Sequence, residues 1–446
     1  MTNTSCTFDD SLPRAVAVLR QALPDIEPEA MRFIRDMTGT LYVVVPDAID
    51  DATLRALSEQ LREALGPYAS PSLSVLRCAE TLTGTALFEE PVLIHWTDDE
   101  FPVFLIERRA VGQDWVVQPE AHFADHPPRF VFFSLKGGVG RSTALSLWGR
   151  HLTQEGRQVL VIDLDLEAPG LGAQLLPEGS QPEFGVLDWL VEDLNGGDTE
   201  AVIAAMTAAS PVSDAGLIVA PALGTRTRQS PGNAIAKLAR AYLEGDQTAD
   251  GSQEGFAARL RRMVERLEQW VGADITLIDS RAGLHETAAA SLLHLDAEVL
   301  LFAVDLPVTW QGYRYLLSHL RQLARSTEVA SSSTMASWRE RIKMIHARAD
   351  ATQAAERSFV ANAYALWTAT LYDDLAPESD EEAAFSFDEH DEAAPHWPYP
   401  ILRVESLERF DPLTGLNRLG EQALNVAFAG FFDGLAERLE ALNDDT

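Results

Sequence analysis

The sequence predicts an α/β protein with a doubly wound, mostly parallel sheet, preceded by a small α+β domain. From about residue 126 onward, apolar runs of strand length alternate with amphipathic stretches of helix length, which favours parallel strands. A glycine-rich segment, residues 135–143, separates the first of these runs from a helical stretch. Residues 1–125 combine helical stretches with short strand-like runs in a different order, so they predict a separate domain.

The first domain has helix and strand signals but no catalytic group of side chains. Apolar residues recur at helical spacing from Asp10 to Leu23 and from Asp51 to Leu65. A hairpin is expected around residues 111–114, and the polar stretch 121–129 is the expected linker. We therefore expect this domain to recognise a protein partner. Its strand-like runs are residues 41–45, 91–96 and 103–106.

The glycine-rich segment has the residue types of a phosphate-binding loop. Glycines let successive backbone N–H groups converge on one cluster of oxygens, and the following helix presents its positive N-terminus. A hydroxyl after a basic residue, here Ser142 after Arg141, can hold Mg²⁺. The strict pattern G-x-x-x-x-G-K-[ST] is missed twice, by Leu135 and by Arg141. A simple turn between a strand and a helix is the alternative, and the surrounding pattern favours nucleotide binding.

That surrounding pattern is a strand, loop, helix and second strand, followed by further strands. The second strand, residues 159–162, ends in Asp163-Leu164-Asp165, and a later apolar run, residues 275–278, ends in Asp279. Because parallel strands end at one edge of a sheet, these carboxylates are expected near the glycine-rich loop, although such residues also occur as solubilising caps. Residues 299–304 and 341–346 are further strand-like runs.

The run Lys136-Gly137-Gly138-Val139-Gly140-Arg141-Ser142-Thr143 resembles the deviant Walker A motif of the ParA/MinD family of P-loop ATPases. The segment 163–170 resembles the switch I of that family, and 279–283 resembles its switch II, with Arg281 where proline is usual. The resemblance extends from about Phe130 to about Leu442 and is strongest at 136–172 and 279–283. It implies a homodimer that binds ATP and Mg²⁺ and slowly hydrolyses ATP to ADP and phosphate.

The resemblance also implies individual roles. Asp165 positions the attacking water, Asp163 lies close to the metal, and Lys136 reaches the phosphates of the partner subunit. Arg281 is either an internal charge stabiliser beside the γ-phosphate or an ion-pair partner at the surface. The remaining roles are phosphate binding by Gly137, Gly138, Val139, Gly140 and Arg141, contact with the α-phosphate by Thr143, and Mg²⁺ binding by Ser142 and, through water, by Asp279.

Two departures from the family pattern bear on mechanism. Arg141 brings a planar, bidentate guanidinium where a lysine would bring a compact charge, which puts turnover in question. The strand at 342–346 continues into Ala347 and Arg348, whereas the family usually has an asparagine that reads adenine, so base specificity stays open.

The net charge and the pattern of apolar residues limit the classes of partner that this protein is expected to bind. With 35 basic and 68 acidic residues the net charge is −33, which opposes attraction to DNA or anionic lipid, so nucleic acid is not an expected partner. The basic stretch 256–270 is interpreted as a solvated helix face, and the acidic amphipathic stretch 419–442 is expected to pack on the sheet. No signal peptide or membrane-spanning run is apparent, so we expect a cytoplasmic protein without a membrane partner.

Two polar insertions interrupt the second domain. Residues 244–254 predict a surface loop. Residues 373–392 contain ten carboxylates and no Lys or Arg, so a loop over about 373–395 is expected to be extended or disordered. Phe385 and Phe387 within it either dock on a partner or belong to a solvated linker.

Three functions are compatible with these patterns. The first is a nucleotide-dependent switch that hydrolyses ATP slowly and signals to a protein partner. The second is a nucleotide-sensing regulatory or scaffold component of a multi-gene system, such as antiphage defence, with negligible turnover. The third is an ATPase that positions DNA or other cargo, which predicts salt-sensitive DNA binding that rises with ATP.

Overall fold

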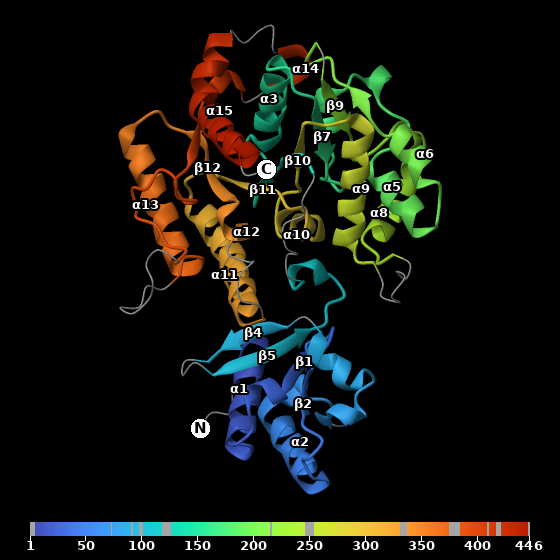
Figure 1. Cartoon of the computed structure of the whole chain (residues 1–446), viewed down its shortest axis with the longest axis vertical. Helices are drawn as coiled ribbons and strands as arrows, with labels where there is room; N and C mark the ends of the chain where they lie inside the picture. Colours follow the sequence, from blue (N-terminus) through green and yellow to red (C-terminus); the bar gives the residue numbers. More distant parts are fainter. Residues whose placement is uncertain are drawn as a thin grey trace. The chain divides into compact units, whose positions relative to one another are not determined.

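The computed structural model describes residues 5–72, 74–90, 92–97, 101–117, 126–214, 216–245, 254–330, 337–373, 384–407, 410–415 and 421–444. The chain divides into two compact units (Figure 1). Unit 1 contains Met1–Gln118 and His319–Met335, and unit 2 contains Pro119–Ser318 and Ala336–Thr446. The predicted boundary near residue 125 is therefore incomplete, because it left residues 319–335 in the second domain.

Unit 1 is a five-stranded sheet with two helices packed against each other, the α+β composition that the sequence predicts. Leu19, Leu57 and Leu61 of the helices are buried with Phe33, Val43 and Leu105 of the sheet in one apolar core. The strand order is β3-β2-β1-β5-β4. The helices are α1 (Phe8–Ala22) and α2 (Asp51–Leu65), and the strands are β1 (Arg32–Arg35), β2 (Leu41–Val45), β3 (Val75–Arg77), β4 (Leu93–Trp96) and β5 (Pro102–Glu107).

The hairpin expected around residues 111–114 is wrong. The antiparallel pair is instead β4 with β5, in which Leu93 lies opposite Leu105. Residues Gln113–Trp115 form a short 3₁₀ helix after Gly112, whose φ is 82°. The Trp115 side chain is buried, and its carbonyl oxygen lies 2.6 Å from Nε2 of His319. Strand β5 is paired with β4 on one side and with β1 on the other, which leaves no free edge for a strand at residues 115–117.

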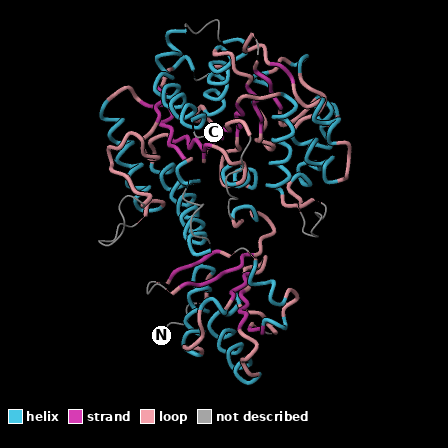
Figure 2. Tube along the Cα trace, viewed as in Figure 1, coloured by secondary structure: helices cyan, strands magenta, loops and turns pink. Residues whose placement is uncertain are grey.

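Unit 2 is built on an eight-stranded sheet of order β13-β12-β11-β6-β10-β7-β9-β8, whose strands are among those coloured magenta in Figure 2. The pairs are parallel except for β8 with β9, and helices cover both faces, so the predicted doubly wound, mostly parallel fold is confirmed. The strands are β6 (Arg129–Ser134), β7 (Val159–Asp163), β8 (Ala208–Ala209), β9 (Leu217–Ala220), β10 (Ile275–Asp279), β11 (Glu298–Ala303), β12 (Ile342–Ala349) and β13 (Tyr399–Leu402).

The helices of unit 2 bury opposite faces of the strands. Trp148 of α3 and Phe431 of α15 pack against Phe132 on one face. Tyr313 of α11 donates a hydrogen bond to the carbonyl of Phe302. The expected packing of the C-terminal helix on the sheet is confirmed. The helices are α3 (Arg141–Gln154), α4 (Leu171–Leu175), α5 (Val186–Leu194), α6 (Thr199–Ala204), α7 (Thr225–Gln229), α8 (Ala234–Ala241), α9 (Phe256–Val271), α10 (Glu286–Leu293), α11 (Pro307–Ala330), α12 (Ser337–Glu340), α13 (Gln353–Thr370), α14 (Pro412–Gly415) and α15 (Glu421–Asp444). From His319 onward, α11 belongs to unit 1.

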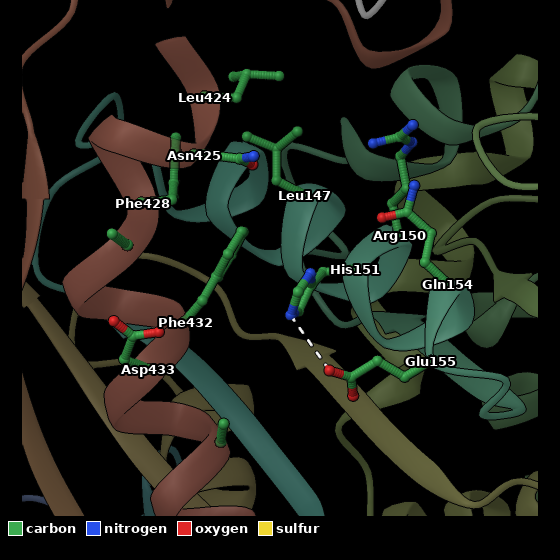
Figure 3. Close-up of a pocket in the computed structure, with 12 residues that line it drawn as sticks. Leu147, Arg150, His151, Gln154, Glu155, Leu424, Asn425, Phe428, Phe432 and Asp433 are labelled. Atoms are coloured by element: carbon green, nitrogen blue, oxygen red, sulfur yellow. Dashed lines mark ion pairs between the residues drawn. The ribbon is translucent and has the colours of Figure 1, made fainter. Parts of the chain in front are cut away.

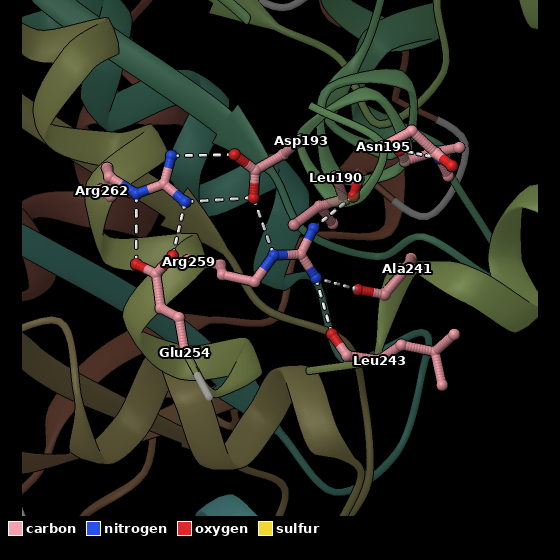
Figure 4. A network of polar contacts seen from close by, with 9 residues as sticks. Leu190, Asp193, Asn195, Ala241, Leu243, Glu254, Arg259 and Arg262 are labelled. Carbon is pink, nitrogen blue, oxygen red and sulfur yellow. Dashed lines mark hydrogen bonds and ion pairs between the residues drawn. The ribbon is translucent and has the colours of Figure 1, made fainter. Parts of the chain in front are cut away.

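The interpretation of the basic helix α9 as a solvated face is wrong for Arg259, whereas Arg266 of the same helix is exposed. Arg259 is fully buried, and its guanidinium donates to Asp193 and to the carbonyls of Leu190 and Leu243 (Figure 4). Arg262 pairs with Asp193 at 2.9 Å and with Glu254 at 2.7 Å. These two arginines therefore neutralise carboxylates of their own unit. The surface of α9 is less basic than the number of arginines in its sequence suggests.

The prediction of an extended or disordered acidic segment is wrong for residues 384–395. Phe385 is buried, and its ring packs with Phe387 against Tyr372. Lys343 of β12 donates to the carbonyl of Ala394 at 2.8 Å, so a buried side chain of the sheet fixes the end of this segment. Residues 374–383 of this segment, and 246–253 of the other insertion, lie outside the described residues. The interpretations of Phe385 and Phe387 as partner contacts or linker residues are replaced by packing within the chain.

A cavity of about 520 Å³ lies between α3 and α15 (Figure 3). Leu147, Phe428 and Phe432 line it with Arg150 and His151, and the His151 ring stacks on Phe432 with centroids 4.8 Å apart. None of the predicted site residues lines this cavity. Among the described residues, no helix combines the length and apolar character needed to cross a bilayer.

Buried His346 in the middle of β12 is expected to make folding sensitive to acid. Burial lowers its pKa from 6.5 to about 4. Between these values the unfolded chain binds a proton that the folded chain does not, so stability falls as the pH falls from 6.5 to 4, by at most about 1.4 kcal/mol per pH unit for this group. The free energy of unfolding, measured with urea at several pH values in this range, should fall less steeply with decreasing pH in His346→Leu than in wild type. An identical slope in the two proteins would contradict the expectation.

Candidate nucleotide-binding site

The glycine-rich loop lies between a buried strand and a helix N-terminus. Strand β6 ends at Ser134, and α3 begins at Arg141. Gly138 has φ 77° and Gly140, the N-cap of α3, has φ 95°. This left-handed conformation strains residues with a Cβ, so glycine is required at both positions. The loop therefore turns sharply into the positive end of a helix, an arrangement that binds phosphate oxygens.

The first departure from the strict P-loop pattern has a packing explanation. The side chain of Leu135 lies against Gly312 of α11, where an added Cβ would come within 2.7 Å of Leu135 Cδ1. A larger side chain at position 312 would therefore displace Leu135. The apolar side chain that replaces the first P-loop glycine holds the start of the loop against α11.

The structure brings the three predicted aspartates to the edge of the sheet where the loop lies. Strand β10 is parallel to both β6 and β7, with Asp279 beside Phe132 on one side and Asp163 on the other. Asp163 and Asp279 are buried, with 1% and 2% of their surface exposed. Asp163 accepts hydrogen bonds from the backbone N–H groups of Asp165 and Gly172. These carboxylates are far apart in the sequence, and the register of the parallel strands places them side by side.

Ser142 and Asp279 are in direct contact, and they fit a magnesium site. The Ser142 hydroxyl donates to Asp279 Oδ2 at 2.7 Å. Hydroxyl and carboxylate oxygens suit Mg²⁺, which usually keeps several waters and takes the rest of its ligands from substrate phosphates. Among the described residues, no group of three or more His, Cys, Asp or Glu side chains is arranged to hold a metal by itself. The donors present therefore fit a metal that arrives with a phosphate ligand.

The Arg141 guanidinium points at carboxylates, which differs from the phosphate contact that the sequence predicts. Its Nε donates to Asp279 Oδ1 at 2.5 Å, and its Nη1 donates to Ser134 Oγ at 3.0 Å. Its Nη2 lies 3.9 Å from Asp165 Oδ2. Only 8% of Arg141 is exposed. This side chain is a buried counter-ion within the acidic cluster formed by Asp163, Asp165 and Asp279.

The acidic cluster perturbs its own protonation. Burial, reinforced by the charge of Asp279, raises the pKa of Asp163 to about 7. Burial also raises the pKa of Asp165, while the nearby Arg141 acts to lower it. Adding a cation at this edge of the sheet would favour the ionised forms. The cluster is therefore suited to bind positive charge.

Arg281 makes the ion pair that was one of its two predicted roles. Its Nη1 lies 2.6 Å from Oε1 of Glu167. The same oxygen accepts from Tyr242 at 2.5 Å and lies 3.3 Å from Nε2 of His285. Sequence reasoning assigned no role to Glu167 or Tyr242. A role for Glu167 could have been suspected from the sequence, because it lies two residues after Asp165 in the segment that resembles switch I.

The remaining loop residues lie around the start of α3. Lys136 is exposed, and its carbonyl accepts a hydrogen bond from the Ser134 hydroxyl. Val139, Gly140 and Thr143 line a cavity of about 60 Å³ beside Arg348. The residues that line the other side of this cavity were not predicted from the sequence, because strand β13 and the segment after it contain no recognised motif. That side consists of Ile401, Leu402, Arg403, Val404, Leu407 and Phe428.

Comparisons with known proteins give matches to solved structures only. No family model matches the chain, and no curated protein matches it. The ATP complex of McdA from Cyanothece is 16% identical, with 70% of this chain and 98% of that chain covered and a TM-score of 0.40. A ParA family ATPase from Chlorobium tepidum is 15% identical, with 69% and 99% covered and a TM-score of 0.42. The cell division ATPase MinD from Pyrococcus furiosus is 15% identical, with 70% and 99% covered and a TM-score of 0.39.

At these identities and TM-scores the likeness carries no weight for function, and the fold rests on the strand order and loop geometry described above. In both its motifs and its structural matches, the chain is similar to the ParA/MinD-family P-loop ATPases.

Proposed function

We propose that this protein is a nucleotide-dependent switch that binds ATP with Mg²⁺ at the glycine-rich loop, hydrolyses it slowly as a homodimer and signals to a protein partner. The observation that carries the proposal is the contact between Ser142 and Asp279, made directly beside a loop that enters a helix N-terminus. Hydroxyl, carboxylate and oriented N–H groups together are the requirements of a magnesium–phosphate site.

The proposed mechanism gives each residue one task. The N–H groups of Gly138, Gly140 and their neighbours hold phosphate oxygens, and Thr143 contacts the α-phosphate. Bound Mg²⁺, held by Ser142 and through water by Asp279, would neutralise phosphate charge. Asp165 orients the attacking water. Lys136, exposed on the loop, supplies its ammonium group to the partner subunit of the dimer.

Calorimetry tests the binding step. Titration with Mg·ATP and with Mg·GTP should give saturable binding of at least one of them, and the comparison would also settle base specificity. Size-exclusion chromatography with and without Mg·ATP should show a shift from monomer to dimer with the nucleotide. Complete absence of binding to both nucleotides would remove the proposal.

Turnover separates the switch from its nearest rival, a sensor that does not hydrolyse. The contact of Arg141 with Asp279 favours the sensor, because it engages a cation that the P-loop pattern would direct to phosphates. We expect the rate of phosphate release to fall at least about tenfold in Lys136→Ala and in Asp165→Ala, since each variant lacks a group proposed to act in hydrolysis. Rates in both variants equal to wild type, with binding intact, would support the sensor.

A further inference from the structure

Resting on the proposed function, we infer that Arg141 and Mg²⁺ compete for Asp279, so that metal binding requires the guanidinium to move. Arg141 would thus couple occupancy of the metal site to a rearrangement at the start of α3. A lysine at the same position would compete with the metal more weakly, because its ammonium group cannot make the same set of contacts.

The first support is that both oxygens of Asp279 are engaged. Oδ1 accepts from Arg141 Nε at 2.5 Å, and Oδ2 accepts from Ser142 at 2.7 Å. An ionised carboxylate offers about four lone-pair positions, so a metal-bound water could still reach Asp279, but only beside the buried guanidinium of Arg141. Ser142 is itself a proposed ligand, so the neighbour that the metal would have to displace is the Arg141 guanidinium.

The second support is the shape of the guanidinium. Its nitrogen atoms point in different directions and reach Asp279, Ser134 and the neighbourhood of Asp165 at once. A lysine ammonium is a single point at the end of a flexible chain and cannot make these contacts together. Arginine is therefore held inside the cluster by several contacts that lysine would lack.

The third support is charge. Asp163, Asp165 and Asp279 form a buried or half-buried acidic cluster, and Arg141 is the cation in contact with it among the described residues. Mg²⁺ and a guanidinium on the same carboxylate would repel each other strongly in a poorly solvated site. Nucleotide phosphates offer the displaced guanidinium another anionic partner. Metal alone should therefore bind weakly, and metal with nucleotide should bind well.

Metal binding without nucleotide tests the inference. Mn²⁺ is titrated into the full-length wild-type protein, Arg141→Gln and Arg141→Lys, with binding followed by the electron paramagnetic resonance signal of free Mn²⁺. We expect a site at least about tenfold tighter in Arg141→Gln than in wild type, and an intermediate affinity in Arg141→Lys. Arg150→Gln, on the same helix and with the same loss of charge, is the control and should match wild type.

A second substitution separates this site from the many other carboxylates of the chain. Adding Asp279→Asn to Arg141→Gln should abolish the gain in Mn²⁺ affinity. If Arg141→Gln does not fold, as judged by circular dichroism, Arg141→Lys decides alone, with tighter Mn²⁺ binding expected. Equal affinity in wild type and the folded Arg141 variants, or a gain that persists without Asp279, overturns the inference. Failure of the proposed function would appear separately, as absence of Mg·ATP binding to the wild type.

Discussion

Asp279→Asn is expected to weaken binding of Mg·ATP by about 10- to 100-fold, the loss typical of removing a group that orients a metal ligand. The carboxylate accepts from the Ser142 hydroxyl and lies next to Asp163 on the neighbouring strand. An amide of the same size keeps the shape but removes the negative charge that would attract the metal. Calorimetry with ATP in the presence of Mg²⁺ and in the presence of EDTA measures the effect.

The loss of ATP affinity in Asp279→Asn should depend on the presence of Mg²⁺. Binding of ATP in EDTA should change much less, since the glycine-rich loop and the helix N-terminus are untouched. Asp274→Asn is the matched control, because Asp274 precedes the same strand at its opposite end and is exposed. Equal losses with Mg²⁺ and with EDTA would assign Asp279 a structural role in place of the metal-linked one.

Glu268→Ala is expected to lower the free energy of unfolding by about 3–5 kcal/mol, the range for removing one partner of a buried ion pair. Glu268 on α9 accepts from Nε and Nη2 of Arg129 at 2.8 and 2.7 Å and from the Thr276 hydroxyl at 2.8 Å. Arg129 is 1% exposed, so the variant leaves its guanidinium buried without a carboxylate. Urea unfolding monitored by circular dichroism gives the change.

Glu265→Ala on the same helix is the control. Its carboxylate is 42% exposed and lies 4.0 Å from Arg261, so the loss should stay within about 0.5 kcal/mol. Glu268→Gln should fall between the two, because it keeps hydrogen-bond acceptance but loses the charge. Similar stabilities for Glu268→Ala and Glu265→Ala would show that Arg129 finds another partner or reaches water.

The fold of unit 2 could be predicted because its strands are buried on both faces. Such strands appear in the sequence as continuous apolar runs, as in residues 130–133 and 159–162, and the glycine-rich segment marks the turn between the first strand and its helix. The short strands β8, β9 and β13 were missed, since two to four residues give no periodicity. In unit 1, β1 and β3 were missed for the same reason.

The candidate site could be predicted as a set of residues but not as a set of contacts. Motif spacing brought Ser142, Asp163 and Asp279 together, because parallel strands share an edge. The orientation of Arg141 could not be inferred, since it depends on the charge balance of side chains that only the sheet brings together. The same limit explains Arg259, whose burial depends on acceptors in α5 and after α8.

The discontinuous make-up of unit 1 affects how the protein can be divided into fragments. Ser326, near the end of α11, accepts the backbone N–H of Ile94 from strand β4 at 2.7 Å, and Gln322 lies 2.6 Å from His95. A fragment ending at residue 125 would expose these groups, so no single cleavage releases unit 1 as an intact module. For the same reason, transplanting this module between proteins by recombination would require two crossover points rather than one.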